Sequence, residues 1–270
     1  MQLDQTRIAI RERSFPAILD LGLHVTRANF GPLLFWLAIG ATPFLLADYA
    51  LLYYYPEPQQ PNEWTGYFLL LAMLIVWQLP LATAPVTLYL GRAMFAQHTS
   101  VRKLLADLAH ALPQLFWYQL VLRGLLTPWC IPWFYLFVSR PFLNEVILLE
   151  RTPFRRRPAA PMSTGRRTSA LHAAMQGELF ARWLLALLFG AALLASAYLS
   201  VVELRDVLLG AGTWGWRGTT LALPLVLWLV IGYFTVVRFL AYLDLRIRRE
   251  GWEVELLMRA EAARLSKQWT

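Results

Sequence analysis

Polar side chains inside long apolar stretches are the residues of this chain whose types could do chemistry. An ionisable group within a membrane span is costly, so it pairs with another group or marks a functional pathway. Five such residues stand out: Asp48, Arg123, Arg140, Asn144 and Glu145. Asp48 and Arg123 fall at similar depth in the first and third predicted spans, so we favour a structural ion pair that holds two helices together.

The stretch around Pro141 is the sharper candidate. Arg140 falls near the bilayer centre, Pro141 should kink the helix because it lacks a backbone N–H, and Glu145 follows about one turn later. This pattern is consistent with a site for an anion or a lipid headgroup, or with a proton-linked carboxylate. The alternatives are that Arg140 bonds backbone carbonyls freed by kinks at Pro80 or Pro85, or that a re-entrant segment keeps it shallow.

No motif in the sequence indicates an enzyme. The Walker loop and the GxGxxG, GxSxG and HExxH patterns are absent. The four histidines (His24, His98, His110 and His172) lie on separate predicted inner-surface segments, without the spacing of metal ligands, and Cys130 is the single cysteine. We therefore predict no catalytic residue, no metal site and no cofactor.

The composition is that of an integral membrane protein. Hydrophobic residues make up 58% of the chain and charged residues 16%, against about 45–50% and about 25% in soluble domains. The mean hydropathy is +0.45. The net charge of +8 comes mostly from arginines beside the apolar runs, where basic residues set topology, so nucleic acid is not an expected partner.

The apolar runs predict an all-α, polytopic bundle of six spans. The predicted spans are residues 31–55, 67–90, 113–127, 130–149, 181–202 and 219–243. Residues 113–149 are too long for one span and short for two, so a re-entrant pair is the alternative there. Outer loops carry only Arg205 and Arg217 as basic residues, which places both termini on the cytoplasmic side of the membrane.

Amphipathic and basic segments flank this six-span domain, residues 31–248, on the predicted inner side. Residues 1–30 form an N-terminal amphipathic segment, residues 151–168 a basic linker and residues 249–270 a C-terminal amphipathic helix. Another surface helix follows Ser100. Its apolar stripe consists of Val101, Leu104, Leu105, Leu108 and Leu112.

The last span continues into a dense charged helix over residues 238–257. Acid and base lie four residues apart three times, so they can pair along a helix face: Asp244 with Arg248, Arg246 with Glu250, and Arg249 with Glu253. We predict a cytoplasmic docking surface formed by Asp244, Arg246, Arg248, Arg249, Glu250 and Trp252. Its expected partners are membrane lipid and a soluble cytoplasmic protein.

Three stretches carry a family resemblance: residues 140–157, residues 169–183 and residues 242–257. They resemble the YciC-type bacterial membrane proteins and the membrane domain attached to some glycerophosphodiester phosphodiesterases. In those families the last span ends in a similar run, matched here by Tyr242, Asp244, Arg246, Arg248, Glu250 and Gly251. The resemblance implies a fold and an inner-membrane location but no reaction, because the phosphodiesterase domain is absent.

These observations together predict a non-catalytic scaffold or accessory subunit. It would present cytoplasmic helices to a soluble partner or to lipid headgroups. The alternative is a small-solute or lipid transporter that uses Asp48, Arg123, Arg140 and Glu145. Convergence of these residues on one cavity favours transport, and separate pairing favours a scaffold.

Overall fold

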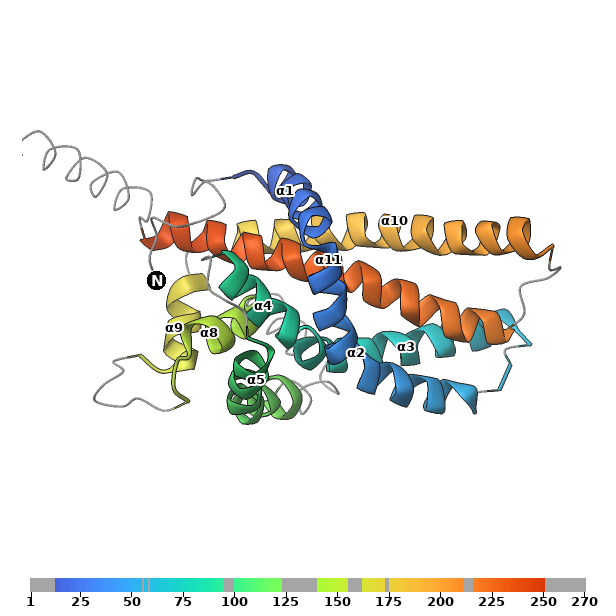
Figure 1. The fold of residues 1–270 in the computed structure, drawn as a ribbon, viewed down its shortest axis with the longest axis horizontal. Coiled ribbons are helices and arrows are strands. Elements are labelled where there is room, and N and C mark those ends of the chain that lie inside the picture. The colour runs from blue at the N-terminus through green and yellow to red at the C-terminus, as the bar shows by residue number, and fades with distance from the viewer. Residues whose placement is uncertain are drawn as a thin grey trace, which may run out of the picture.

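A computed structural model describes residues 13–54, 56–57, 59–94, 100–122, 140–154, 162–172, 175–210 and 216–250. Every element of regular structure in these ranges is a helix, as Figure 1 shows. The elements are α1 (Phe15–Ala28), α2 (Phe30–Tyr53), α3 (Pro61–Ala82), α4 (Ala84–Met94), α5 (Val101–Leu115), the π-helix η2 (Phe116–Leu122), α8 (Leu143–Glu150), α9 (Thr164–His172), α10 (Gln176–Leu209) and α11 (Trp216–Glu250). The all-α prediction is confirmed.

Four helical stretches of the described residues are long and apolar enough to cross a membrane. They are Phe30–Leu52, Glu63–Met94, Gln176–Leu208 and Gly218–Arg249. These stretches contain the first, second, fifth and sixth predicted spans except for the last residues of the first, so the membrane assignment is supported by helix length as well as by composition.

The region of the third and fourth predicted spans has a different form. The surface helix α5 continues directly into η2, and residues 123–139 lie outside the described residues. After them, Pro141 and Phe142 form a turn, and α8 has eight residues, too few to span a bilayer. The described ends of this region fit either two short spans or a re-entrant pair, so both alternatives stay open.

The second predicted span is two helices rather than one. The helical hydrogen-bond pattern is interrupted at one residue, Thr83, between α3 and α4, although its backbone stays in the α region. Pro85 explains the break, because it has no N–H for the carbonyl four residues earlier and its ring crowds that carbonyl. At this break α2 comes very close: a Cβ built on Gly40 would lie 2.0 Å from the Ala82 carbonyl oxygen.

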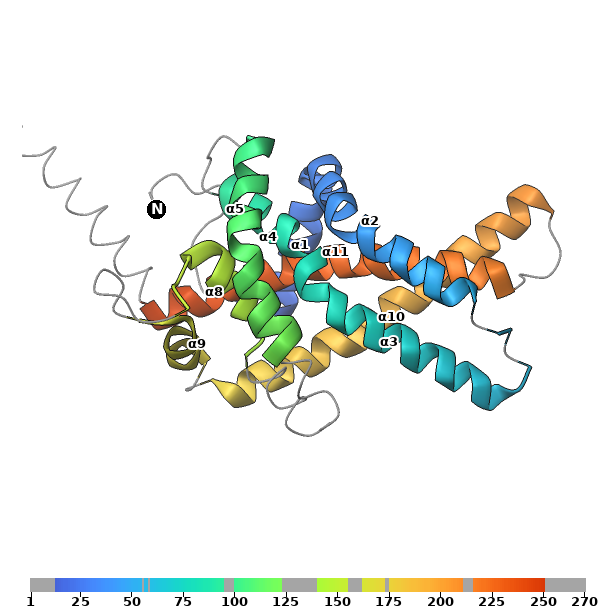
Figure 2. The same cartoon turned by 90° about the horizontal axis from the view of Figure 1, so that it is seen from below.

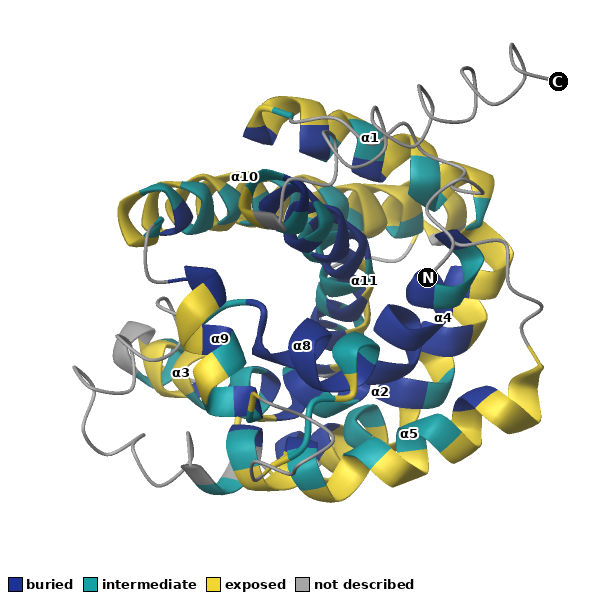
Figure 3. Ribbon diagram, turned by 90° about the vertical axis from the view of Figure 1, so that its left-hand side faces the viewer, coloured by how far each residue is buried: buried dark blue, intermediate teal, exposed yellow. Residues whose placement is uncertain are grey.

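Helix α11 is the centre of the bundle. It runs beside α10 along the long axis of the molecule and contacts α1, α2, α4, α9 and α10 (Figure 1). Of its apolar stretch 56% is buried, whereas none of the corresponding stretch of α10 is. Figure 3 shows the contrast between a mostly buried α11 and an α10 that is exposed along most of its length. Helix α11 continues unbroken past residue 243, the predicted end of the last span, to Glu250.

The two amphipathic helices α1 and α5 lie across the long axis, as Figure 2 shows. Helix α1 buries Phe15, Ile18 and Gly22 against the bundle. Helix α5 buries Leu104 but leaves Leu105 and Leu112 each 40% exposed. This orientation suits helices that lie along a membrane surface while the four long helices cross it.

Candidate functional site

One end of the molecule carries a dense set of ion pairs, which we call the ion-pair end. Its acidic residues are Asp107, Glu150, Glu178 and Asp244, and each contacts at least one arginine. These acids come from the middle of α5, the last residue of α8, the first turn of α10 and the last two turns of α11.

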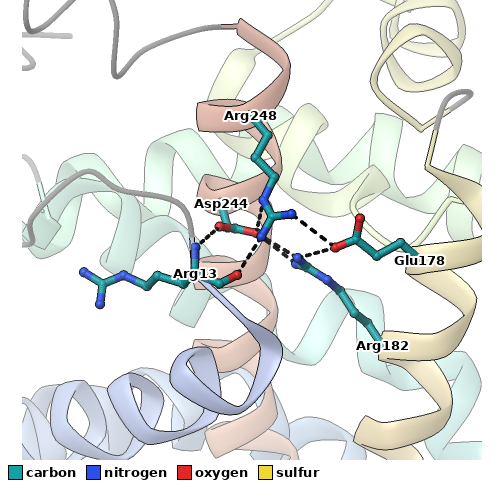
Figure 4. Close-up of polar contacts among 5 residues, drawn as sticks. All are labelled: Arg13, Glu178, Arg182, Asp244 and Arg248. Atoms are coloured by element: carbon teal, nitrogen blue, oxygen red, sulfur yellow. Dashed lines mark hydrogen bonds and ion pairs between the residues drawn. The ribbon is translucent and has the colours of Figure 1, made fainter.

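Asp244 of α11 is the most deeply buried of the four acids, with 3% of its surface exposed. One carboxylate oxygen accepts a hydrogen bond of 2.8 Å from the backbone N–H of Arg13. The other accepts two bonds of 3.0 Å from Arg182 of α10 and lies 3.1 Å from Nε of Arg248 (Figure 4). The last contact confirms the predicted pairing of Asp244 with Arg248.

Arg248 closes this network from the other side. Its guanidinium donates to the Arg13 carbonyl oxygen at 2.7 Å and lies 3.4 Å from the Glu178 carboxylate (Figure 4). Glu178 also accepts a bond of 2.6 Å from Arg182. Because both backbone groups of Arg13 are bonded to α11 side chains, the start of α1 is fixed to the end of α11.

Glu150 joins its own helix, α8, to α9 and α11. Its carboxylate accepts bonds of 2.5 and 3.0 Å from Arg167 of α9 and a bond of 2.7 Å from the Tyr242 hydroxyl of α11. Nε of Arg246 lies 3.7 Å away. The acids therefore hold α8, α9 and α11 together by charge-assisted hydrogen bonds, the stronger class of hydrogen bond.

Asp107 has the corresponding role for α5. It pairs with Arg92 at the end of α4, and it accepts a bond of 2.6 Å from Arg151. Arg151 ends α8 in a left-handed conformation, with φ of 49°.

A second ion pair lies deeper in the bundle. Glu145 of α8 is fully buried and accepts a bond of 2.7 Å from Nε of Arg238 on α11. Arg238 also donates to the Thr83 hydroxyl at 3.3 Å, at the break between α3 and α4. The other Glu145 oxygen has no hydrogen bond among the described residues.

Asn144, the neighbour of Glu145, satisfies a backbone group of another helix. Its amide donates to the Pro80 carbonyl oxygen at 3.0 Å and accepts from Gln119 of η2 at 2.5 Å. The sequence analysis considered Arg140 for bonds to carbonyls freed near Pro80, but the side chain that bonds the Pro80 carbonyl is Asn144.

Arg140 lies half-buried just before the turn at Pro141 rather than inside a helix. Its charge lies close enough to the Tyr118 hydroxyl to interact with it electrostatically. The following turn is bonded to His172, whose Nε2 lies 3.4 Å from the Phe142 backbone N–H while Nδ1 lies 2.6 Å from the Thr168 carbonyl oxygen. This geometry is that of a neutral imidazole that donates from Nδ1 and accepts at Nε2.

Asp48 lies elsewhere, between α2 and α3. It is fully buried and accepts a bond of 2.5 Å from the Gln78 amide. Arg123, its predicted partner, lies outside the described residues, so the predicted ion pair between them stays a prediction.

The predicted polar site is thus divided. Asn144 and Glu145 are adjacent and bonded to neighbouring helices, Arg140 lies at the turn before them, and Asp48 has a separate partner. Sequence reasoning missed Arg238 and Gln119, which come from segments distant in sequence. Each of the two is a single polar residue inside an apolar run of the sequence, and this was the only local feature that could have indicated it.

The predicted docking residues also have internal partners. Asp244 and Arg248 face the network of Figure 4, Arg246 faces Glu150, and Arg249 donates to the Ala170 carbonyl oxygen at 3.0 Å. The side chain of Glu250 and all of Trp252 lie outside the described residues. These four described side chains therefore have partners within the chain, Arg249 is also exposed, and the docking role stays a prediction.

A cavity of about 310 Å³ lies between α10, α11 and the ends of α3 and α8. Its polar lining consists of Gln119, Asn144, Arg182, Thr235 and Arg238. Of the residues proposed from sequence, Asn144 reaches it, whereas Asp48 and Glu145 are not part of its wall.

Comparison with known proteins adds no assignment: no family model, no curated protein and no solved structure matches this chain.

Proposed function

We propose that this protein is a non-catalytic scaffold or accessory subunit of a bacterial inner membrane, with the ion-pair end in the cytoplasm. The observation that carries the proposal is that the acids of this end are consumed in bonds between helices. Such bonds engage the carboxylates of these four described acids in fixing helix positions rather than in chemistry.

The surface left at the ion-pair end is basic. Arg102 and Lys103 of α5 and Arg166 of α9 are exposed, while Asp107 and Glu150 beside these elements are bonded to arginines. A soluble partner with an acidic surface fits this arrangement, because exposed charges of one sign steer and select partners of the opposite sign. Lipid headgroups are the other partner that this surface suits.

Capture of partners from detergent extracts tests the proposal. We expect the triple variant Arg102→Glu, Lys103→Glu, Arg166→Glu to lose at least 90% of a specifically captured soluble protein. The matched control changes the charge of exposed residues away from the ion-pair end, with Glu57→Lys and Glu203→Lys. If the triple variant captures as much of the soluble protein as the control variant does, the docking role is contradicted.

The topology has its own test. Six spans with cytoplasmic termini predict that the linker and the loop after the first span lie on opposite sides of the membrane. With Cys130 changed to serine, a cysteine at Ser163 should resist an impermeant thiol reagent in intact cells and a cysteine at Gln59 should react. The reverse pattern would contradict the orientation that the distribution of basic residues predicts.

Transport is a second candidate, favoured by one observation: Asn144 and Arg238 both line the cavity. It requires the Glu145–Arg238 pair to open during a cycle. A Glu145→Gln variant that folds but abolishes the cellular role of the protein would favour transport over a scaffold, and one that retains the role would count against it.

A further inference from the structure

The cavity between α10 and α11 has a composition that changes along its length. Thirteen of its eighteen lining residues are apolar, which is the lining of a site for an apolar ligand. Leu187, Ile231 and Phe234 line the part farther from the ion-pair end, whereas Arg182 and Arg238 lie nearer to that end on antiparallel neighbouring helices. An elongated ligand with one apolar and one anionic end fits this gradient.

Of the two arginines, Arg238 has hydrogen-bonding capacity left. Arg182 directs both of its terminal nitrogens at Asp244 and Glu178. Arg238 uses Nε for Glu145 and one terminal nitrogen for Thr83. Its other terminal nitrogen makes no hydrogen bond within the described part of the chain, and 21% of the side chain is exposed. A guanidinium edge of this kind is a suitable donor to a phosphate oxygen.

The walls of the cavity indicate where such a ligand comes from. Thirteen of the eighteen lining residues belong to α3, α10 and α11, three of the helices that are long and apolar enough to cross a membrane. Helix α10 is also lined with exposed leucines along this part, including Leu184, Leu185 and Leu188. The site is therefore reached from the bilayer, in which phospholipids are the abundant amphiphiles.

We infer that this cavity binds one acyl chain of an anionic phospholipid, with the phosphate at Arg238. This binding site goes beyond the scaffold role, since it is separate from the exposed basic residues of α5 and α9. Lipid tails are about as apolar as leucine, so moving a chain from the bilayer into the cavity changes its free energy little. Selection among lipids must therefore come from the headgroup contact.

Lipid retained by the purified full-length protein tests the inference. After exchange into detergent, the protein is incubated with equimolar dioleoylphosphatidylglycerol and dioleoylphosphatidylcholine, and bound lipid is counted by native mass spectrometry. We expect about fivefold more phosphatidylglycerol than phosphatidylcholine. Both lipids present a phosphate to Arg238, but only phosphatidylcholine adds a choline cation beside it, and the expected ratio is the one that a single charge contact at a membrane surface provides.

Two variants on α10 separate the cavity from the outer surface. Ala186→Trp fills the cavity and should abolish the retained phosphatidylglycerol. Leu188→Trp adds the same indole to a position that is 60% exposed and should leave retention unchanged. Equal retention by wild type and both variants would overturn the cavity as the site.

The headgroup contact is tested by the double variant Glu145→Leu, Arg238→Met, which removes both charges together. It should bind the two lipids equally, and a preserved preference for phosphatidylglycerol would overturn the role of Arg238. If Ala186→Trp does not fold, photo-crosslinking replaces it. A benzoylphenylalanine at Trp183 should then label phosphatidylglycerol preferentially while one at Leu188 labels both lipids, and equal labelling from Trp183 would refute the inference.

Discussion

Removing Arg238 should destabilise the protein more than removing its partner Glu145. The two side chains lie 2.7 Å apart, so at an effective dielectric constant of about 20 their attraction is about 6 kcal/mol. Glu145 is fully buried, whereas Arg238 is 21% exposed. Arg238→Met leaves a buried carboxylate without its cation, and we expect a loss of about 3–5 kcal/mol in the free energy of unfolding.

Glu145→Gln should cost less, about 1–3 kcal/mol, because the amide still accepts a hydrogen bond and the remaining guanidinium is partly exposed. In the double variant Glu145→Leu, Arg238→Met no charge is stranded, so its stability should lie within about 1 kcal/mol of wild type. The strong non-additivity of the three variants is the signature of a buried pair.

Unfolding by sodium dodecyl sulfate in mixed micelles, followed by near-ultraviolet circular dichroism, measures these differences. The exposed Arg102→Met is the control for loss of an arginine and should change stability by no more than about 0.5 kcal/mol. The reasoning is refuted if Arg238→Met costs less than Glu145→Gln, or if the double variant is as unstable as Arg238→Met.

Four further substitutions, one of them a control, test the packing and the buried polar groups. Gly40→Ala should destabilise the protein by at least about 2 kcal/mol in the same assay, because the new Cβ would overlap the Ala82 carbonyl oxygen. The control Gly31→Ala, whose new Cβ would have no atom within contact distance, should stabilise the protein by about 0.5–1 kcal/mol. Equal effects of the two substitutions would contradict the close approach of α2 to Ala82. Asp244→Asn should release the start of α1 and raise the rate of trypsin cleavage near residue 13 at least tenfold, and an unchanged rate would show that this network does not hold α1. Asn144→Ala leaves the Pro80 carbonyl oxygen without its donor and should cost about 1–3 kcal/mol by denaturant titration, so a neutral result would argue against this bond.

The second predicted span is where hydropathy and the tertiary structure differ. Its apolar run is continuous, so hydropathy predicts one helix over residues 67–90. The structure breaks it at Thr83, because the backbone demand of Pro85 acts locally whatever the hydropathy of its neighbours. Gly40 then accommodates the break by close approach of α2, a contact that depends on how two helices pack.

The candidate site likewise contains pairs that the sequence predicts and pairs that only the fold brings together. Asp244 and Arg248 are one helical turn apart, so their pairing follows from the 3.6-residue period and was predicted. The partners of Glu145 and Glu150 are separated from them by 93 and 17 residues, and no local pattern indicates such pairs. Arg246 lies beside Glu150, which the position of α8 next to α11 brings into reach. The side chain of Glu250, the predicted partner of Arg246, is not among those described, so that pairing stays a prediction.

The sequence by itself determined that this is an all-helical protein suited to a membrane, because apolar length and the helical period of charges are local properties. It also determined which few polar residues lie in apolar surroundings. Only the tertiary structure decided which of these residues meet. Ion pairing and hydrogen bonding act over a few ångströms, and the distances between helices are set by side-chain packing across the whole bundle.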